Sequence, residues 1–183
     1  GWEVKIADLD PAQGTSTKWS MRRDEMKIEP EIPVEKYRDA ERALKDADSY
    51  DLMIMDGPAH AGKSALTMAR SSDLVLFPTG YSIDDLDAQI QLAYDIQDSG
   101  ISSDKFRMVF SRARGVSKED TAARAFVEKA QLQSLSNVLR ELPSVRQAHA
   151  LGKSAGETGF RSVDNDSRAL IMEISAILTA GEN

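Results

Sequence analysis

Acidic residues follow two apolar runs of the sequence, each at the point where the run ends. Asp8 and Asp10 come after the run at residues 3–7, and Asp56 comes after the run at residues 51–55. Carboxylate oxygens are the ligands that Mg²⁺ prefers, and transfer of a phosphoryl group needs such a metal held in a fixed place. In parallel sheets, ligands bind beyond the carboxyl ends of the strands. The two runs therefore predict a site for Mg²⁺ and phosphate.

A competing phosphate-binding pattern lies directly after Asp56. The segment Gly57-Pro58-Ala59-His60-Ala61-Gly62-Lys63-Ser64 fits the Walker A pattern G-x-x-x-x-G-K-[ST], and it lies between an expected strand and an expected helix. Only a short helix fits before the next strand, however, and no later strand ends in an aspartate that could hold the metal. We therefore interpret Lys63 as a surface lysine. A P-loop kinase that uses Gly57–Ser64 remains an alternative.

The elements that must position these residues alternate along the chain. Apolar runs predict strands, and helical spacing of apolar residues predicts helices. Strands are expected at residues 3–7, 27–32, 51–55, 73–77, 105–110 and 138–142, and helices at 15–23, 34–47, 64–70, 82–98, 118–130 and 166–179. Runs of this kind are buried on both faces. The pattern predicts one α/β domain over residues 1–183, with three layers and helices on both faces of a mostly parallel sheet.

The composition argues against several classes of protein. The formal net charge is -7, so bulk charge does not favour coating of nucleic acid. Cysteine is absent and histidine occurs twice, which argues against thiolate and histidine metal sites. The sequence has no apolar run of membrane-spanning length and no secretory leader. We expect a cytoplasmic protein without a membrane anchor.

Three segments, in this order, resemble the motifs of the ParA/MinD-type deviant-Walker-A P-loop ATPases. They match the switch I strand and loop (D-x-D-P-Q-G), the Walker B strand with its D-x-P turn, and the strand that follows, at residues 1–14, 50–59 and 72–79. A weaker match is formed by Arg146, Gly152 and Glu157. The order and spacing agree over about residues 1–160. The resemblance implies the P-loop ATPase fold, with ATP and Mg²⁺ as cofactors.

The resemblance also implies roles for individual residues. Asp56, followed by the Gly57-Pro58 turn at the nucleotide, would hold Mg²⁺ through water. Asp8 would lie near the metal and the γ-phosphate, and Asp10 would orient the attacking water. The alternative for Asp8 and Asp10 is a solvated loop whose acids cap a helix.

The sequence departs from the family pattern in three ways. The phosphate-binding loop K-G-G-x-x-K-T is missing, and we expect it upstream with the first strand and the first helix. That strand is usually central, so without it the sheet would have a hole. Ala12 stands between Pro11 and Gln13, which lengthens the switch I loop by one residue. Arg112 follows a strand where the family often has an asparagine for the adenine, and we expect Arg112 to contact the base or a phosphate.

The implied function is an ATP-dependent dimerisation switch in plasmid or chromosome partition, or in DNA transfer. The implied partners are a second copy of the chain, a ParB-like adaptor and non-specific DNA. The candidate DNA-binding residues are Arg112, Arg114, Lys118 and Arg146. Acids are interleaved among them, so ordinary charged helix faces remain the alternative. The other alternative is a non-catalytic relative that keeps the fold and has lost the phosphate loop.

Overall fold

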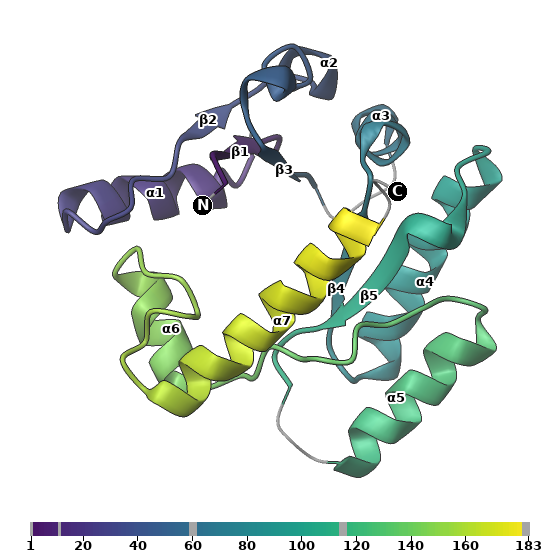
Figure 1. Cartoon of the computed structure of the whole chain (residues 1–183). Helices are drawn as coiled ribbons and strands as arrows, with labels where there is room; N and C mark the ends of the chain where they lie inside the picture. Colours follow the sequence, from purple (N-terminus) through teal and green to yellow (C-terminus); the bar gives the residue numbers. More distant parts are fainter. Residues whose placement is uncertain (1, 11, 59–61, 114–116, 181–183) are drawn as a thin grey trace.

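The computed structural model describes residues 2–10, 12–58, 62–113 and 117–180. Its strands are β1 (Val4–Asp8), β2 (Val34–Lys36), β3 (Leu52–Asp56), β4 (Val75–Thr79) and β5 (Phe106–Phe110). Its helices are α1 (Thr15–Glu25), α2 (Ala40–Ala43), α3 (Lys63–Ser71), α4 (Ile83–Asp98), α5 (Ser117–Lys129), α6 (Pro143–Ala150) and α7 (Arg161–Ala180), as Figure 1 shows. In this part of the chain no helix is long and apolar enough to cross a membrane.

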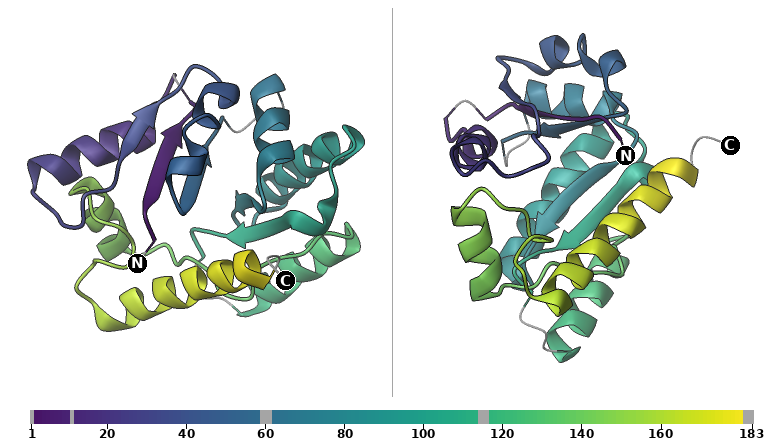
Figure 2. Two further views of the ribbon diagram at one scale, coloured as in Figure 1. Left: turned by 45° about the horizontal axis from the view of Figure 1, so that its top comes forward. Right: turned by 60° about the vertical axis from the view of Figure 1, so that its left-hand side comes forward.

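The strands form two separate parallel sheets. The first half-sheet has the order β2-β1-β3 and the second half-sheet pairs β4 with β5. Figure 2 shows them as two groups of strands. The parallel pairing and the flanking helices confirm the predicted α/β class. The split leaves β3 and β4 as edge strands, and Ile54 on β3 and Leu76 on β4 are 45% and 38% exposed.

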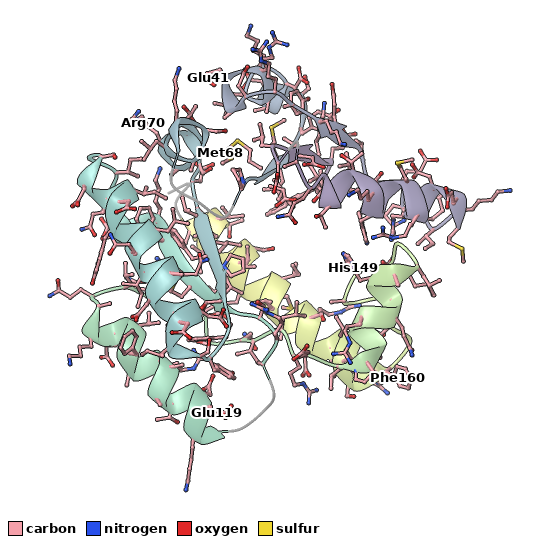
Figure 3. All side chains as sticks on the ribbon, turned by 180° about the vertical axis from the view of Figure 1, so that it is seen from behind. Glu41, Met68, Arg70, Glu119, His149 and Phe160 are labelled. Atoms are coloured by element: carbon pink, nitrogen blue, oxygen red, sulfur yellow. The ribbon has the colours of Figure 1, made fainter. Side chains whose placement is uncertain are left out.

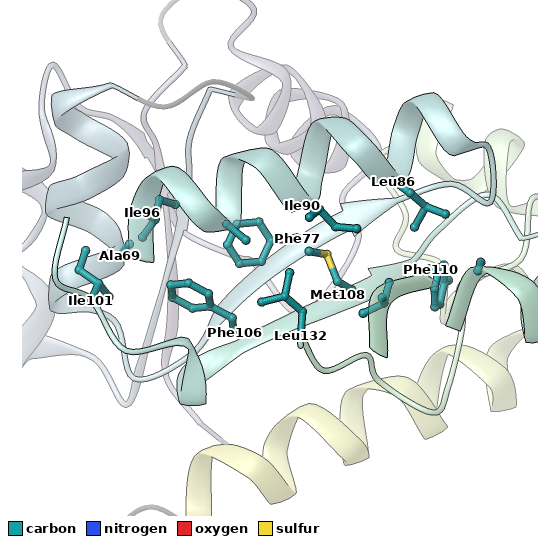
Figure 4. Packing of buried hydrophobic residues seen from close by; sticks show 13 residues of the cluster. Ala69, Phe77, Leu86, Ile90, Ile96, Ile101, Phe106, Met108, Phe110 and Leu132 are labelled. Atoms are coloured by element: carbon teal, nitrogen blue, oxygen red, sulfur yellow. The ribbon is translucent and has the colours of Figure 1, made fainter. Parts of the chain in front are cut away.

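The second half-sheet carries the largest core. Phe77 of β4 and Phe106 of β5 meet edge to face with their ring centroids 5.3 Å apart, and apolar side chains of α4 and α5 cover them. Figure 4 shows this packing. Val109 points to the opposite face, where Leu170 of α7 covers it. Alternation of side chains along β5 thus buries both faces of the strand, which is why its sequence is almost wholly apolar.

Helix α3 connects the two halves on one face. Its Ala69 packs in the core of the second half-sheet, while Met68 packs with Ala7, Met53 and other apolar residues of the first half-sheet. Met68 is labelled in Figure 3, which views the molecule from behind. The two half-sheets therefore share one helical layer although no strand pairing joins them.

Arg23 of α1 connects this helix to the segment between α6 and α7. The Arg23 side chain is only 2% exposed. Its guanidinium makes two hydrogen bonds to the carboxylate of Glu157, at 2.9 and 3.0 Å, and donates to the carbonyl of Gly152 at 3.2 Å. This network fixes the α6–α7 connection against α1.

Two predictions between β1 and β3 are wrong. The expected strand at residues 27–32 is absent, and the expected helix at 34–47 is divided into β2, α2 and a 3-10 turn at Ala47–Ser49. The apolar residues of this segment have helical spacing, but Val34–Lys36 pairs with β1 instead. Buried Lys5 of β1 supports that pairing, because its Nζ lies 2.7 Å from the carboxylate of Glu35.

The expectations near the C-terminus also need correction. Residues 138–142 form no strand. Leu139 N–H donates to the carbonyl of Phe110 at the end of β5 at 2.9 Å, and Arg140 makes an isolated parallel bridge with Ala113, beyond that strand. Helix α6 was not predicted, since Pro143 reads as the end of a strand, whereas proline also suits the first turn of a helix. Helix α7 begins at Arg161, five residues before the predicted start at 166.

Candidate functional site

The two aspartates predicted to hold the metal end neighbouring strands. Asp8 is the last residue of β1, Asp56 is the last residue of β3, and the two are directly paired in the parallel register. Their side chains consequently leave the same edge of the first half-sheet on the same face, because successive side chains alternate along a strand. Two carboxylates thus converge at the carboxyl ends of two strands, as expected from the sequence.

Asp8 is buried and makes hydrogen bonds to the start of α1. The side chain is 1% exposed. Its Oδ2 accepts from the backbone N–H of Thr17 at 3.0 Å and from the Thr17 hydroxyl at 2.6 Å. The N-cap residue Gly14 has no side chain for this purpose, so Asp8 satisfies a free N–H of the first turn from a neighbouring strand. Asp8 does cap a helix, but it does so from a buried strand end and not from a solvated loop.

One of the two carboxylate oxygens of Asp56 accepts a hydrogen bond. The Ser16 hydroxyl donates to Asp56 Oδ2 at 2.6 Å. Among the described residues, none donates a hydrogen bond to Oδ1. A carboxylate with one oxygen fixed and the other open is suited to bind Mg²⁺ directly or through a water molecule.

Asp10 stabilises its own loop. Its Oδ1 accepts from the backbone N–H groups of Ala12 and Gln13 at 3.1 and 3.2 Å, and its carbonyl accepts from Gly14 N–H at 2.8 Å. The Asp10 carboxylate, which is predicted to orient the attacking water, therefore also stabilises the loop that carries it. Its predicted part in hydrolysis stays a prediction.

The donor set at this edge fits a weakly held magnesium ion better than a closed metal cage. Within residues 2–10, 12–58, 62–113 and 117–180, no group of three or more acidic or histidine side chains could hold a metal. Two carboxylates and neighbouring hydroxyls leave most positions to water and to phosphate oxygens, which is the usual environment of Mg²⁺ in nucleotide sites. Asp8 and Asp56 would hold the ion if nucleotide brings it.

Gly57 and Pro58 follow β3 as predicted, but Gly57 also has a packing role. A Cβ at this position would lie 2.3 Å from Cε of Met68 on α3. The end of the Met68 side chain therefore packs against Gly57 and would have to shift if a side chain were added there. Residues 59–61 of the competing Walker A pattern lie outside the described residues.

The C-terminal end of the Walker A pattern, Gly62-Lys63-Ser64, lies near acidic side chains. Gly62 is the N-cap of α3, and Lys63 begins the helix. Lys63 and Ser64 line a cavity of about 420 Å³ together with Asp39 and Glu41. The negative charges of Asp39 and Glu41 in this cavity disfavour a phosphate there, which favours the interpretation of Lys63 as a surface lysine.

The predicted basic residues are spread over separate elements. Arg112 follows β5 in the second half-sheet with its side chain 65% exposed, and its guanidinium lies 4.0 Å from the carboxylate of Asp85. Arg146 of α6 pairs with Glu141 at 3.2 Å. Lys118 lies on α5, while Arg114 lies outside the described residues. Arg112 is thus not in the half-sheet that carries Asp8 and Asp56.

Ser16 and Thr17 are the residues of this site that sequence reasoning missed. Both lie in the first turn of α1 and contact aspartates that the sequence had singled out. The available signal was the hydroxyl run Thr15-Ser16-Thr17 after the switch I loop, but the sequence does not show that it faces two strand ends.

Comparison with solved structures finds proteins of similar fold. McdA from Cyanothece is 15% identical, with a TM-score of 0.70 over 95% of this chain and 88% of that one. MinD in the MinC:MinD cell division complex of Aquifex aeolicus is 10% identical, with a TM-score of 0.66 over 93% and 84%. MinD from Pyrococcus horikoshii, complexed with Mg-ADP, is 15% identical, with a TM-score of 0.61 over 87% and 77%.

Sequence comparisons add nothing to these matches: no protein-family model and no curated protein matches the chain. The structural matches rest on the arrangement of strands and helices and not on residue identity. They cover most of each chain at TM-scores above 0.6. The chain therefore has the fold of the ParA/MinD-type P-loop ATPases.

Proposed function

We propose that this chain is a ParA-like ATPase, an ATP-dependent dimerisation switch that acts in plasmid or chromosome partition or in DNA transfer. The observation that carries the proposal is the pairing of Asp8 with Asp56 at the ends of adjacent parallel strands. In open α/β sheets this edge is where ligands bind. The fold and the Mg-ADP bound to MinD from Pyrococcus horikoshii support nucleotide as the ligand.

The proposed roles of the carboxylates follow from what phosphoryl transfer requires. The protein must position groups and balance charge; it needs no covalent nucleophile. Asp56, with Oδ1 open, would hold the nucleotide's Mg²⁺ through water. Asp8 would lie near the same metal ion and the γ-phosphate. Asp10, on the loop that follows β1, would orient the attacking water. When bound, Mg²⁺ would neutralise charge on the phosphates.

The phosphate-binding loop is proposed to lie between the two half-sheets. Central strands of parallel sheets are normally covered and paired on both sides. β3 and β4 are edge strands here, and each exposes an apolar side chain, Ile54 and Leu76. A further parallel strand between them would pair with both edges. It would also bring a K-G-G-x-x-K-T loop to the edge where Asp8 and Asp56 lie.

The proposed partners are a second copy of the chain, an adaptor protein and DNA. We propose a homodimer that recruits a ParB-like adaptor; MinD of Aquifex aeolicus was solved in complex with MinC, which supports the recruitment of a partner protein. DNA would be bound without sequence preference by Arg112, Arg114, Lys118 and Arg146. Arg112 and Arg146 both lie near carboxylates, so such binding would be weak and sensitive to salt. We propose a cytoplasmic location without membrane attachment.

The test is to determine the N-terminal sequence and intact mass of the protein from its native host, followed by ATP binding with that chain. An upstream K-G-G-x-x-K-T and Mg²⁺-dependent ATP binding would support the switch. A chain that begins at Gly1 and binds no nucleotide would favour the non-catalytic interaction module, whose two half-sheets are already joined by α3 and Arg23. Binding by residues 1–183 alone, lost in Lys63→Ala, would favour the kinase.

A further inference from the structure

Two consecutive hydroxyl groups at the start of α1 hold the two aspartates of the site. Ser16 Oγ donates to Asp56 Oδ2 at 2.6 Å, and Thr17 Oγ1 donates to Asp8 Oδ2 at 2.6 Å. The Thr17 backbone N–H adds a second hydrogen bond to the same oxygen of Asp8 at 3.0 Å. One helical turn thereby contacts the ends of two strands, β1 and β3.

These contacts differ from the usual behaviour of hydroxyls in a helix. Serine and threonine within helices commonly bond to the carbonyl one turn earlier or to water. In the first turn of α1 there is no earlier carbonyl of the helix to accept, and both hydroxyls reach across to strand residues. Each bond joins a neutral donor to an ionisable acceptor at a short distance, which is the stronger class of hydrogen bond.

The bond from Ser16 decides which oxygen of Asp56 is available, whereas both oxygens of Asp8 accept hydrogen bonds, Oδ1 from the backbone N–H of Asp10 at 3.3 Å. The terminal torsion of an aspartate is broad and roughly two-fold, so a free carboxylate rotates easily. Ser16 fixes Asp56 Oδ2, and no described residue bonds to Oδ1. Residues that orient a metal ligand in this way typically contribute about 10–100-fold to metal affinity.

We infer that Ser16 and Thr17 are positioning residues for Asp56 and Asp8, and that Ser16 holds Asp56 with its free Oδ1 directed to the ligand. The identity of that ligand, Mg²⁺ with a nucleotide, rests on the function proposed above; the hydrogen bonds themselves do not. Ser16 carries the larger effect, because the Asp56 carboxylate accepts no other hydrogen bond from the described residues. Thr17 shares the positioning of Asp8 with its own backbone N–H and with that of Asp10, and both survive substitution of the Thr17 side chain.

A tryptophan on helix α1 can report on metal binding through its fluorescence. Trp19 lies one turn beyond Ser16, and its Nε1 donates to the carbonyl of Lys153 at 3.1 Å. A change at the start of α1 on metal binding should alter the surroundings of this indole. The other tryptophan, Trp2, can be removed by Trp2→Phe so that fluorescence reports on Trp19 alone.

The experiment uses the full chain in the Trp2→Phe background and titrates Mg²⁺, both alone and with ATP, while Trp19 fluorescence is recorded. Ser16→Ala should weaken the apparent Mg²⁺ affinity about tenfold or more. Ser16→Thr, which keeps the hydroxyl, should restore it to within about threefold. Thr17→Val should have a smaller effect than Ser16→Ala, and Thr17→Ser should have almost none.

Thr15→Ala is the matched control, because no described residue makes a hydrogen bond to that exposed hydroxyl. Thermal unfolding of each variant shows that it is folded.

The outcomes separate the inference from the proposed function. If Mg²⁺ alone shifts the fluorescence and Ser16→Ala weakens that response, the inference stands even if ATP does not bind, and the proposed function then fails. If ATP and Mg²⁺ bind and folded Ser16→Ala matches Thr15→Ala, the inference is overturned and the proposed function stands. If folded wild-type protein responds to neither ligand, both are overturned.

Discussion

Arg23 of α1 and Glu157 of the α6–α7 connection form a two-pronged ion pair, with nitrogen–oxygen distances of 2.9 and 3.0 Å. Arg23 is almost fully buried, so removal of its partner's charge leaves a cation with only carbonyl acceptors. Glu157→Gln should lower the free energy of unfolding by about 2 kcal/mol, the size of a hydrogen bond to a charged group. Chemical denaturation with urea measures this directly.

The same pair predicts a pH dependence. The Arg23 guanidinium, and then the Ser154 backbone N–H, lower the pKa of Glu157 from 4.5 to about 2. A carboxyl group with a lowered pKa in the folded state stabilises that state above its unfolded pKa and loses this contribution as pH falls through the folded value. The stability difference between wild type and Glu157→Gln should therefore shrink between about pH 4.5 and pH 2. A constant difference across that range would contradict it.

Gly152 lies against the backbone of Arg23 and has a φ of 75°. A Cβ at this position would lie 2.3 Å from the Arg23 nitrogen, which no side-chain movement can relieve. Gly152→Ala should cost more than about 3 kcal/mol, combining overpacking with backbone strain. Gly159→Ala is the control: its φ is 80°, but nothing lies within 4 Å, so only the strain of about 1 kcal/mol is expected. Equal losses in the two variants would show that the contact with Arg23 contributes nothing.

Asp10→Asn should separate hydrolysis from binding. The asparagine keeps an oxygen for the N–H groups of Ala12 and Gln13, so the loop should be preserved. The proposed role is to orient the attacking water, and its loss should reduce ATP turnover by about 100-fold or more. ATP affinity should change little. Parallel turnover and equilibrium binding assays on the full chain check both; unchanged turnover would remove Asp10 from the mechanism.

Lys63→Ala should leave ATP affinity unchanged within about twofold, because Asp39 and Glu41 share the cavity that Lys63 lines. Equilibrium binding of a fluorescent ATP analogue gives this comparison, with Lys45→Ala as a control for removal of a surface charge. A loss of binding specific to Lys63→Ala would show that Gly57–Ser64 is a working phosphate loop.

The sequence predicts the strands that are buried and the residues at their ends, but not how the chain connects them. β1, β3, β4 and β5 follow from short segments rich in apolar residues, and Asp8 and Asp56 are predicted at strand ends. Their direct pairing depends on the order and register of the strands, which the sequence does not show. β2 did not follow, because a three-residue edge strand has no periodicity of its own and forms by pairing with β1. Ser16 was missed for a similar reason: its partner, Asp56, is forty residues away, and only the packing of α1 brings them together.

In the proposed function, Asp56, beside Asp8, holds the Mg²⁺ of a bound nucleotide. The most direct test is the ATP affinity of the full chain, with Mg²⁺ and with EDTA, for wild type and Asp56→Asn. We expect Mg²⁺ to tighten ATP binding to the wild type and Asp56→Asn to remove about tenfold or more of that gain, while the ATP affinity in EDTA is unchanged. The same Mg²⁺-dependent gain in wild type and Asp56→Asn would contradict it.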